Sequence, residues 1–273
     1  MTSDNRFQKI QLTNDIAARV SPGDKDTVLW LHGYTLDSSS WEEIWSLLPG
    51  WRHIGLDLPG HGASAAIKRG ASVKELGQQL AEVCRQQHIQ HLVALSFGTI
   101  TALQIAIELP DYFKSITLGA PSMAGGPQDQ EMTQTYSKLI FMHKMLGRSD
   151  AIHQVWLNSP AWKGIESRPG LKDTLTVLVK NHSWAELDSF DLMKQFFFPP
   201  QQVSDFQHIR TAINVIVGEH EMPAFKEVAA LIAENAQNVT LSDLPGAYHL
   251  CMLQKPEEAA KLVEKNLMCP VTR

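Results

Sequence analysis

The chain has 273 residues, of which 44% are apolar and 19% are charged. This composition is typical of a globular protein and excludes a disordered chain or a fibrous repeat. The length fits one large α/β domain with an insertion better than two domains of full size. The net charge is −5 and the lysines and arginines are scattered, so we expect no nucleic-acid partner.

The amino-terminal residues and the cysteines indicate the compartment. Residues 1–6 lack the apolar core of a secretion signal, and no later apolar run is long enough to cross a bilayer. We therefore expect a cytoplasmic protein with no membrane partner. Cys84, Cys251 and Cys269 lie far apart, which favours reduced thiols over a disulfide framework or a zinc site.

The first part of the chain alternates short apolar runs with amphipathic segments. Runs at 7–12 and 16–20, joined at the turn-forming pair Asn14-Asp15, predict a hairpin. Further strands are expected at 28–31, 53–56, 92–95 and 115–118. Helices are expected around 73–84, where apolar residues recur every three or four positions, and at 100–109.

The pattern changes after Pro121. Residues 122–207 contain Trp156, Trp162, Trp184 and a Met-rich helical stretch at 138–146, with no convincing strand, which indicates a helical insertion. Strands return at 212–217 and 239–241, each followed by a helix, the last one at 256–267. Alternating strands and helices predict a mostly parallel central sheet with helices on both faces. We divide the chain into a first part of the α/β core (1–121), the insertion (122–207) and a second part of the core (208–273).

A serine stands where a strand turns sharply into a helix, in the sequence Leu95-Ser96-Phe97-Gly98. Such a turn lifts the hydroxyl above the sheet and directs the Phe97 amide, at the helix N-terminus, towards an oxyanion formed there. Ala94 occupies the position of the first glycine in the usual G-x-S-x-G pattern. The alternative is that Ser96 only caps the helix.

A second glycine-containing segment, Leu31-His32-Gly33-Tyr34, follows an earlier strand. Glycine allows close approach of the backbone to a ligand, and the Tyr34 amide can act as the second oxyanion donor. We expect the His32 ring to brace this loop by hydrogen bonds rather than to act as a base.

The loops after the last two strands supply a base and an acid. His249 lies in the final loop, after Gly246, where its imidazole can reach Ser96 and move a proton. A serine needs such a base, and the base needs a carboxylate to orient it. The loop after 213–217 offers Glu219 and Glu221; we choose Glu221 and keep Glu219 as the alternative.

Five blocks in order resemble the α/β-hydrolase superfamily over nearly the whole chain: Leu31–Tyr34, Leu56–Ser64, Leu95–Gly98, Val217–Glu221 and Gly246–Leu250. The resemblance implies an α/β-hydrolase fold in which 122–207 is a helical lid. It also implies an acid at Glu221, where the family usually has aspartate. Serine at position 96, instead of aspartate, argues against epoxide hydrolase and haloalkane dehalogenase chemistry.

This resemblance implies a serine hydrolase that cleaves an ester or thioester of a small, largely apolar acyl substrate through an acyl-enzyme on Ser96. Trp156, Met142 and Met145 are the expected substrate-binding residues. No cofactor is expected, because no complete phosphate-binding glycine loop or metal cluster is present. Three alternatives remain: a carbon-carbon bond hydrolase, lyase or acyltransferase with the same triad; a thioesterase acting on an acyl carrier protein; and a non-catalytic ligand receptor. The carrier-protein alternative would use the lid residues Lys138, Lys144, Lys163 and Arg148.

Overall fold

The computed structural model describes residues 7–189 and 191–268. Its centre is an eight-stranded sheet in the order β1-β2-β4-β3-β5-β6-β7-β8. The strands are β1 (Gln8–Gln11), β2 (Ala17–Ser21), β3 (Thr27–Leu31), β4 (Arg52–Leu56), β5 (Ile89–Leu95), β6 (Ser115–Gly119), β7 (Ala212–Gly218) and β8 (Val239–Leu244).

The sheet is parallel from β4 to β8 and antiparallel at one edge. β1 and β2 form the predicted hairpin, and β2 pairs antiparallel with β4. β4, β3, β5, β6, β7 and β8 then pair in parallel. The carboxyl ends of β3, β5, β7 and β8 therefore lie along one edge of the sheet, where ligands bind in this kind of architecture.

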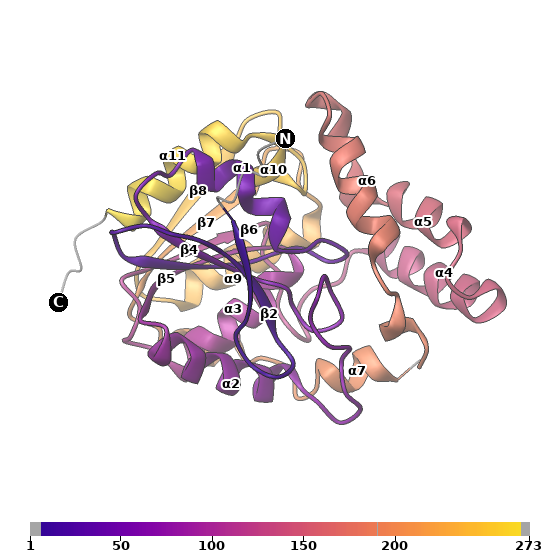
Figure 1. The fold of residues 1–273 in the computed structure, drawn as a ribbon, viewed down its shortest axis with the longest axis horizontal. Coiled ribbons are helices and arrows are strands. Elements are labelled where there is room, and N and C mark those ends of the chain that lie inside the picture. Colours follow the sequence, from indigo (N-terminus) through magenta and orange to yellow (C-terminus); the bar gives the residue numbers. More distant parts are fainter. Residues whose placement is uncertain (1–6, 190, 269–273) are drawn as a thin grey trace.

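Helices cover both faces of the sheet, which confirms the predicted fold class (Figure 1). The core helices are α1 (Glu42–Ser46), α2 (Val73–Gln86), α3 (Phe97–Glu108), α9 (Pro223–Asn235), α10 (Cys251–Gln254) and α11 (Pro256–Leu267). The short α1, preceded by the 3-10 turn Ser38–Trp41, is an element that the sequence patterns did not predict. Helix α2 begins with a capping box between Ser72 and Glu75, and α9 and α11 begin with proline.

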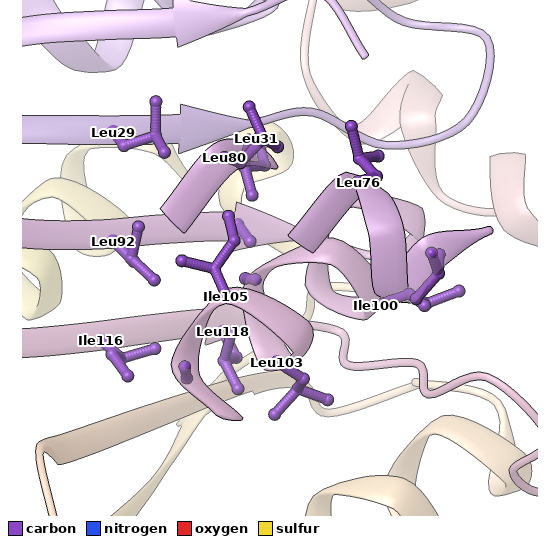
Figure 2. Close-up of a cluster of buried hydrophobic side chains, with 14 of the residues drawn as sticks. Leu29, Leu31, Leu76, Leu80, Leu92, Ile100, Leu103, Ile105, Ile116 and Leu118 are labelled. Carbon is purple, nitrogen blue, oxygen red and sulfur yellow. The ribbon is translucent and has the colours of Figure 1, made fainter. Parts of the chain in front are cut away.

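Alternation along the central strands divides the core into two layers. Leu29 and Leu31 of β3 pack towards α2 and α3, whereas Val28 and Trp30 point to the face that carries α1 and α11. Figure 2 shows the first layer, in which leucines and isoleucines of the strands lie against those of the two helices. Because both faces are covered, the central strands are buried at nearly every position, as is usual for parallel sheets.

Between β6 and β7 the described residues form helices and no strand. They are α4 (Gln130–Leu146), α5 (Asp150–Leu157), α6 (Leu171–Asn181), α7 (Leu192–Phe196) and α8 (Val203–Phe206), with 3-10 turns at Pro160–Trp162, Ile165–Ser167 and Ala185–Leu187. We call residues 122–207, apart from Phe190, the helical segment. Helices α4, α5 and α6 stand at one end of the molecule, beside the sheet (Figure 1).

A helix that crosses a membrane must be both long and apolar. Among the helices of the described residues, none is long and apolar enough to span a bilayer.

Candidate functional site

Ser96 lies at a strained turn between β5 and α3. Its backbone has φ 50° and ψ −118°, a conformation that is rare for residues other than glycine. Gly98 permits the turn, because a Cβ there would come within 2.5 Å of the Leu31 carbonyl oxygen at the end of β3. The Ser96 hydroxyl does not cap α3, so the cap interpretation finds no hydrogen bond to support it.

The structure brings Ser96, His249 and Glu221 into one hydrogen-bonded chain. The Ser96 Oγ lies 2.7 Å from His249 Nε2, and His249 Nδ1 lies 3.0 and 3.1 Å from the two carboxylate oxygens of Glu221. Gly218 helps to bring the last two loops together, because a Cβ there would come within 2.3 Å of the Tyr248 carbonyl oxygen. Since Nδ1 faces a carboxylate, it carries the proton and leaves Nε2 as an acceptor for the serine proton.

All three side chains are buried, and Glu221 is oriented by its own loop. The exposed fractions of Ser96, His249 and Glu221 are 9%, 3% and 5%. Glu221 Oε1 also accepts a 2.7 Å hydrogen bond from the Met222 amide. Glu219 is exposed and accepts from the Gly246 amide instead, so the geometry favours Glu221 over its alternative.

Phe97 and Tyr34, whose backbone N–H groups the sequence predicts as oxyanion donors, belong to the two segments that meet at the serine. Phe97 is the first residue of α3, and Tyr34 follows Gly33 in the loop after β3. Both residues line the same cavity as Ser96 and His249. Within the part of the chain that the structure describes, neither amide donates to a protein acceptor.

A cavity of about 280 Å³ opens onto Ser96 and His249. Its wall combines core residues with residues of the helical segment and is mostly apolar: Leu36, Ile100, Met132, Tyr136, Ile140, Trp156, Trp162, Leu187, Met193, Phe197, Phe225, Val228 and Leu250. Asp129, which caps α4 by accepting from the Met132 amide, is the one carboxylate that the described residues contribute to the wall of this cavity. No lysine or arginine of the described chain lines it.

The predicted substrate-binding residues are only partly in the cavity. Trp156 lines it. Met142 and Met145 do not line it; Met142 is half-buried and Met145 is 66% exposed. The reason is helical periodicity, because α4 turns Met132, Tyr136 and Ile140, spaced by four, towards the cavity.

Three further titratable groups near the site, His32, His61 and Cys251, are buried. His32 accepts a hydrogen bond from the Leu58 amide at its Nε2, 3.0 Å away, and braces the loop as expected. Burial lowers the pKa of His32, and burial with the neighbouring His182 and His32 lowers that of His61 well below its usual value. Burial likewise raises the pKa of the Cys251 thiol, so this cysteine is not a reactive thiolate.

Sequence reasoning missed one group of polar residues beside the site. Glu186, in the helical segment, accepts hydrogen bonds from the Tyr34 hydroxyl and from His182 Nε2, the latter at 2.9 Å. The only sequence signal was the i,i+4 spacing of His182 and Glu186. No sequence pattern pointed to Tyr34, which lies 152 residues away.

The family model described as "Alpha/beta hydrolase family" matches residues 28–262. The chain belongs to this family. The match confirms the resemblance that the five sequence blocks indicated. Among the described residues, no group of three or more His, Cys, Asp or Glu side chains could hold a metal ion.

Curated proteins that are similar in sequence to this α/β-hydrolase chain are named for several different activities. A 2-succinyl-6-hydroxy-2,4-cyclohexadiene-1-carboxylate synthase of Enterobacter sp. is 23% identical over 83% of this chain and 90% of its own length. A pimeloyl-[acyl-carrier protein] methyl ester esterase of Vibrio vulnificus is 32% identical over 41% of this chain and 42% of its own. Two other relatives, an acetyltransferase component of Cupriavidus necator and a probable lysophospholipase of Arabidopsis thaliana, are matched over only 31% and 30% of their lengths.

Solved structures share the whole fold with this α/β-hydrolase chain. The enol-lactonase of Burkholderia xenovorans superimposes with a TM-score of 0.77 at 17% identity, covering 93% of this chain and 96% of that one. Naproxen esterase of Bacillus subtilis gives 0.77 at 15% identity, covering 96% and 92%. At these identities the likeness establishes the fold alone.

Proposed function

We propose that this protein is a serine hydrolase that cleaves a carboxylic ester or thioester of a small, largely apolar acyl substrate through an acyl-enzyme on Ser96. The observation that carries the proposal is the hydrogen-bonded chain from Ser96 Oγ through His249 to Glu221, at 2.7 and 3.0 Å, on the floor of an apolar cavity. This is the geometry that activates a serine for attack on a carbonyl carbon.

The proposed reaction has two steps. Ser96 Oγ attacks the carbonyl carbon while His249 Nε2 takes the hydroxyl proton, and the tetrahedral intermediate then expels the alcohol or thiol, which receives that proton. Water, deprotonated by His249, attacks the acyl-enzyme, and the proton returns to Ser96 as the acid leaves. Glu221 stays ionised and stabilises the imidazolium that forms in both steps.

The amides of Tyr34 and Phe97 are proposed to bind the oxyanion. Both line the cavity beside Ser96 and neither donates to another acceptor of the described chain. Phe97 also lies at the N-terminus of α3, where the partial positive charge of the helix favours an anion. Such donors contribute about 3 to 4 kcal/mol each to the transition state.

The cavity wall favours a neutral substrate. Its apolar residues bury an alkyl or aryl acyl group, whereas an anion would meet Asp129 and no lysine or arginine of the described residues. A dicarboxylate of the kind named for the Enterobacter synthase would therefore be poorly accommodated. The proposed partner is a free small-molecule acyl ester or thioester, with an acyl carrier protein as the alternative donor.

The proposal is tested with a fluorophosphonate serine probe, followed by a panel of p-nitrophenyl esters and acyl-coenzyme A thioesters of graded chain length. We expect the wild-type protein to be labelled at Ser96, the Ser96→Ala and His249→Ala variants to resist labelling, and turnover to favour apolar acyl groups. Absence of labelling and turnover in the wild type would identify a silent scaffold that only binds a ligand. Turnover confined to acyl groups on a carrier protein, or products from carbon-carbon cleavage, would replace the proposed substrate class.

A further inference from the structure

The loop that supplies the Tyr34 amide is held from the helical segment at two points. The Tyr34 hydroxyl donates to Glu186, which belongs to the 3-10 turn Ala185–Leu187. The Trp156 Nε1, on α5, donates to Thr35 Oγ1 over 2.7 Å, and Thr35 Oγ1 donates in turn to the Tyr34 carbonyl oxygen over 2.6 Å. The two contacts come from different elements and reach adjacent residues of the loop.

Both contacts are buried, and one of them is charge-assisted. Glu186, Trp156 and Thr35 have exposed fractions of 5%, 3% and 1%. Burial raises the pKa of Glu186, but the hydrogen bonds and charge of His182 outweigh it and hold that pKa below its usual value. Burial and the Glu186 charge raise the pKa of Tyr34 well above its usual value, so a neutral hydroxyl donates to a carboxylate.

Thr35 needs a restraint from outside the loop. Its φ of 63° lies in the left-handed region, which is unfavourable for a β-branched residue and costs about 1 to 3 kcal/mol. Such a conformation persists only where the surroundings over-determine it. The hydrogen bond from Trp156 to the Thr35 hydroxyl is such a restraint, and it acts next to the Tyr34 amide.

We propose that Glu186 and Trp156 are positioning residues, which set the Tyr34 amide for the oxyanion by holding the Tyr34-Thr35 segment from the helical segment. The inference rests on the proposed acyl transfer at Ser96. Neither hydrogen bond is made to substrate. Docking of the helical segment on the loop therefore contributes to transition-state stabilisation and not only to enclosure of the substrate.

The prediction is a loss in kcat and in transition-state affinity without a matching change in KM. Displacing an oxyanion donor by a fraction of the hydrogen-bond length leaves substrate binding in the ground state intact. It lowers the rate by up to about 100-fold, because the donor stabilises the transition state less well. Tyr34→Phe and Trp156→Phe each remove one hydrogen bond and keep an aromatic ring in the cavity wall. We expect each to lower kcat roughly 10- to 100-fold, because the amide is then less well placed.

Substitutions of Glu186 test the acceptor, and double variants test whether the two contacts are independent. Glu186→Gln keeps an acceptor for the Tyr34 hydroxyl and should restore most of the rate that Glu186→Leu loses. In the Tyr34→Phe background, Glu186→Leu should cause little additional loss of kcat, since both changes remove the same hydrogen bond, whereas Trp156→Phe should multiply the loss.

The matched control is Trp184→Phe, which truncates another buried tryptophan of the helical segment. Its ring, like that of Trp156, packs edge-on against Tyr34, but within the described residues its Nε1 has no hydrogen-bond partner and it does not line the cavity. For all variants we would measure kcat, KM, inhibition by an alkylboronic acid that forms a tetrahedral adduct with the serine, fluorophosphonate labelling and the melting temperature. We expect boronic acid affinity to fall in parallel with kcat in the Tyr34 and Trp156 variants and to be retained in Trp184→Phe.

Two results would overturn the inference. One is an unchanged kcat in both Tyr34→Phe and Trp156→Phe at an unchanged melting temperature. The other is a loss of kcat that follows melting temperature equally in these variants and in Trp184→Phe, which would indicate a structural role only. Both require a wild-type protein that is labelled and turns over ester, so they differ from failure of the proposed function itself.

Discussion

The two walls of the site are built in different ways. Ser96, His249 and Glu221 stand on loops after β5, β8 and β7, and the parallel ladders from β5 to β8 are continuous in register. The opposite wall comes from helices α4 and α5 and short turns, and it joins the Tyr34-Thr35 segment through side-chain hydrogen bonds. The backbone hydrogen bonds of the sheet thus position the reacting groups, whereas side-chain hydrogen bonds hold the opposite wall of the cavity in place.

The two regions also differ in how completely they bury apolar side chains. Ten large apolar side chains of the described residues are exposed, and six of them belong to the helical segment: Tyr136, Phe141, Met145, Leu146, Val177 and Phe198. Regions with less buried apolar contact open at lower free energy than the core. We therefore expect this wall to open at a lower free energy than the sheet that carries Ser96, His249 and Glu221.

The largest expected effect belongs to the core wall. Ser96→Ala should lower kcat by roughly 10⁴-fold or more, and Glu221→Gln by about 10⁴-fold, because the imidazole loses its nucleophile or its orienting charge. Steady-state ester hydrolysis measures both. Retention of full activity in Glu221→Gln would break the assignment of the acid to the loop after β7.

The next largest effect is expected on stability, because truncations in the sheet core and in the helical segment should have different consequences. Leu92→Ala, in the fully buried layer under α2 and α3, should lower the free energy of unfolding by about 2 to 5 kcal/mol. Leu175→Ala, on α6, removes a side chain that is 2% exposed, yet we expect it chiefly to speed protease cleavage within the helical segment. Urea denaturation and limited proteolysis measure the difference. Equal shifts of a single unfolding transition would show that both regions unfold as one unit.

Acidification should weaken the core through a buried histidine. Burial lowers the pKa of His53 to about 4, although its hydrogen bond to the Leu48 carbonyl oxygen raises it. An unfolded histidine titrates near 6.5, so between about pH 6.5 and 4 only the unfolded chain binds the proton, and stability falls by up to about 1.4 kcal/mol per pH unit. His53→Gln, which can still accept from Trp30 Nε1, should reduce the drop in urea midpoint between pH 7 and 5. If the urea midpoint of His53→Gln falls as much as that of the wild type, groups other than His53 cause the loss of stability.

The smallest effect is expected on the outer surface of α4. Met145→Ser should change stability by less than about 0.5 kcal/mol and leave the acyl-chain preference unchanged, because the side chain is 66% exposed. Ile140 lines the cavity, so the larger side chain in Ile140→Trp should fill part of the cavity and shift the substrate preference towards shorter acyl chains. A chain-length profile measured on both variants tests the assignment of the α4 face; a shift in Met145→Ser alone would reverse it.

Local patterns in the amino-acid sequence were enough to predict the fold class and the candidate nucleophile, base and acid. Strand and helix periods are local, so the terminal helix was predicted at the residues that α11 occupies. Each member of the Ser96, His249 and Glu221 set follows a strand, and parallel strands end at one edge, so their convergence could be expected before any coordinates. The short α1 was missed because it shows too few turns for a periodic pattern.

The residues that enclose the cavity could not be predicted in this way, because they depend on packing between distant segments. The rotation of α4 about its axis selects Ile140 over Met145, and that rotation is set by packing between segments distant in the chain. The same is true of Glu186, whose contact with Tyr34 joins residues 152 positions apart. A local pattern carries the period of a helix but not the neighbour that each of its faces will meet.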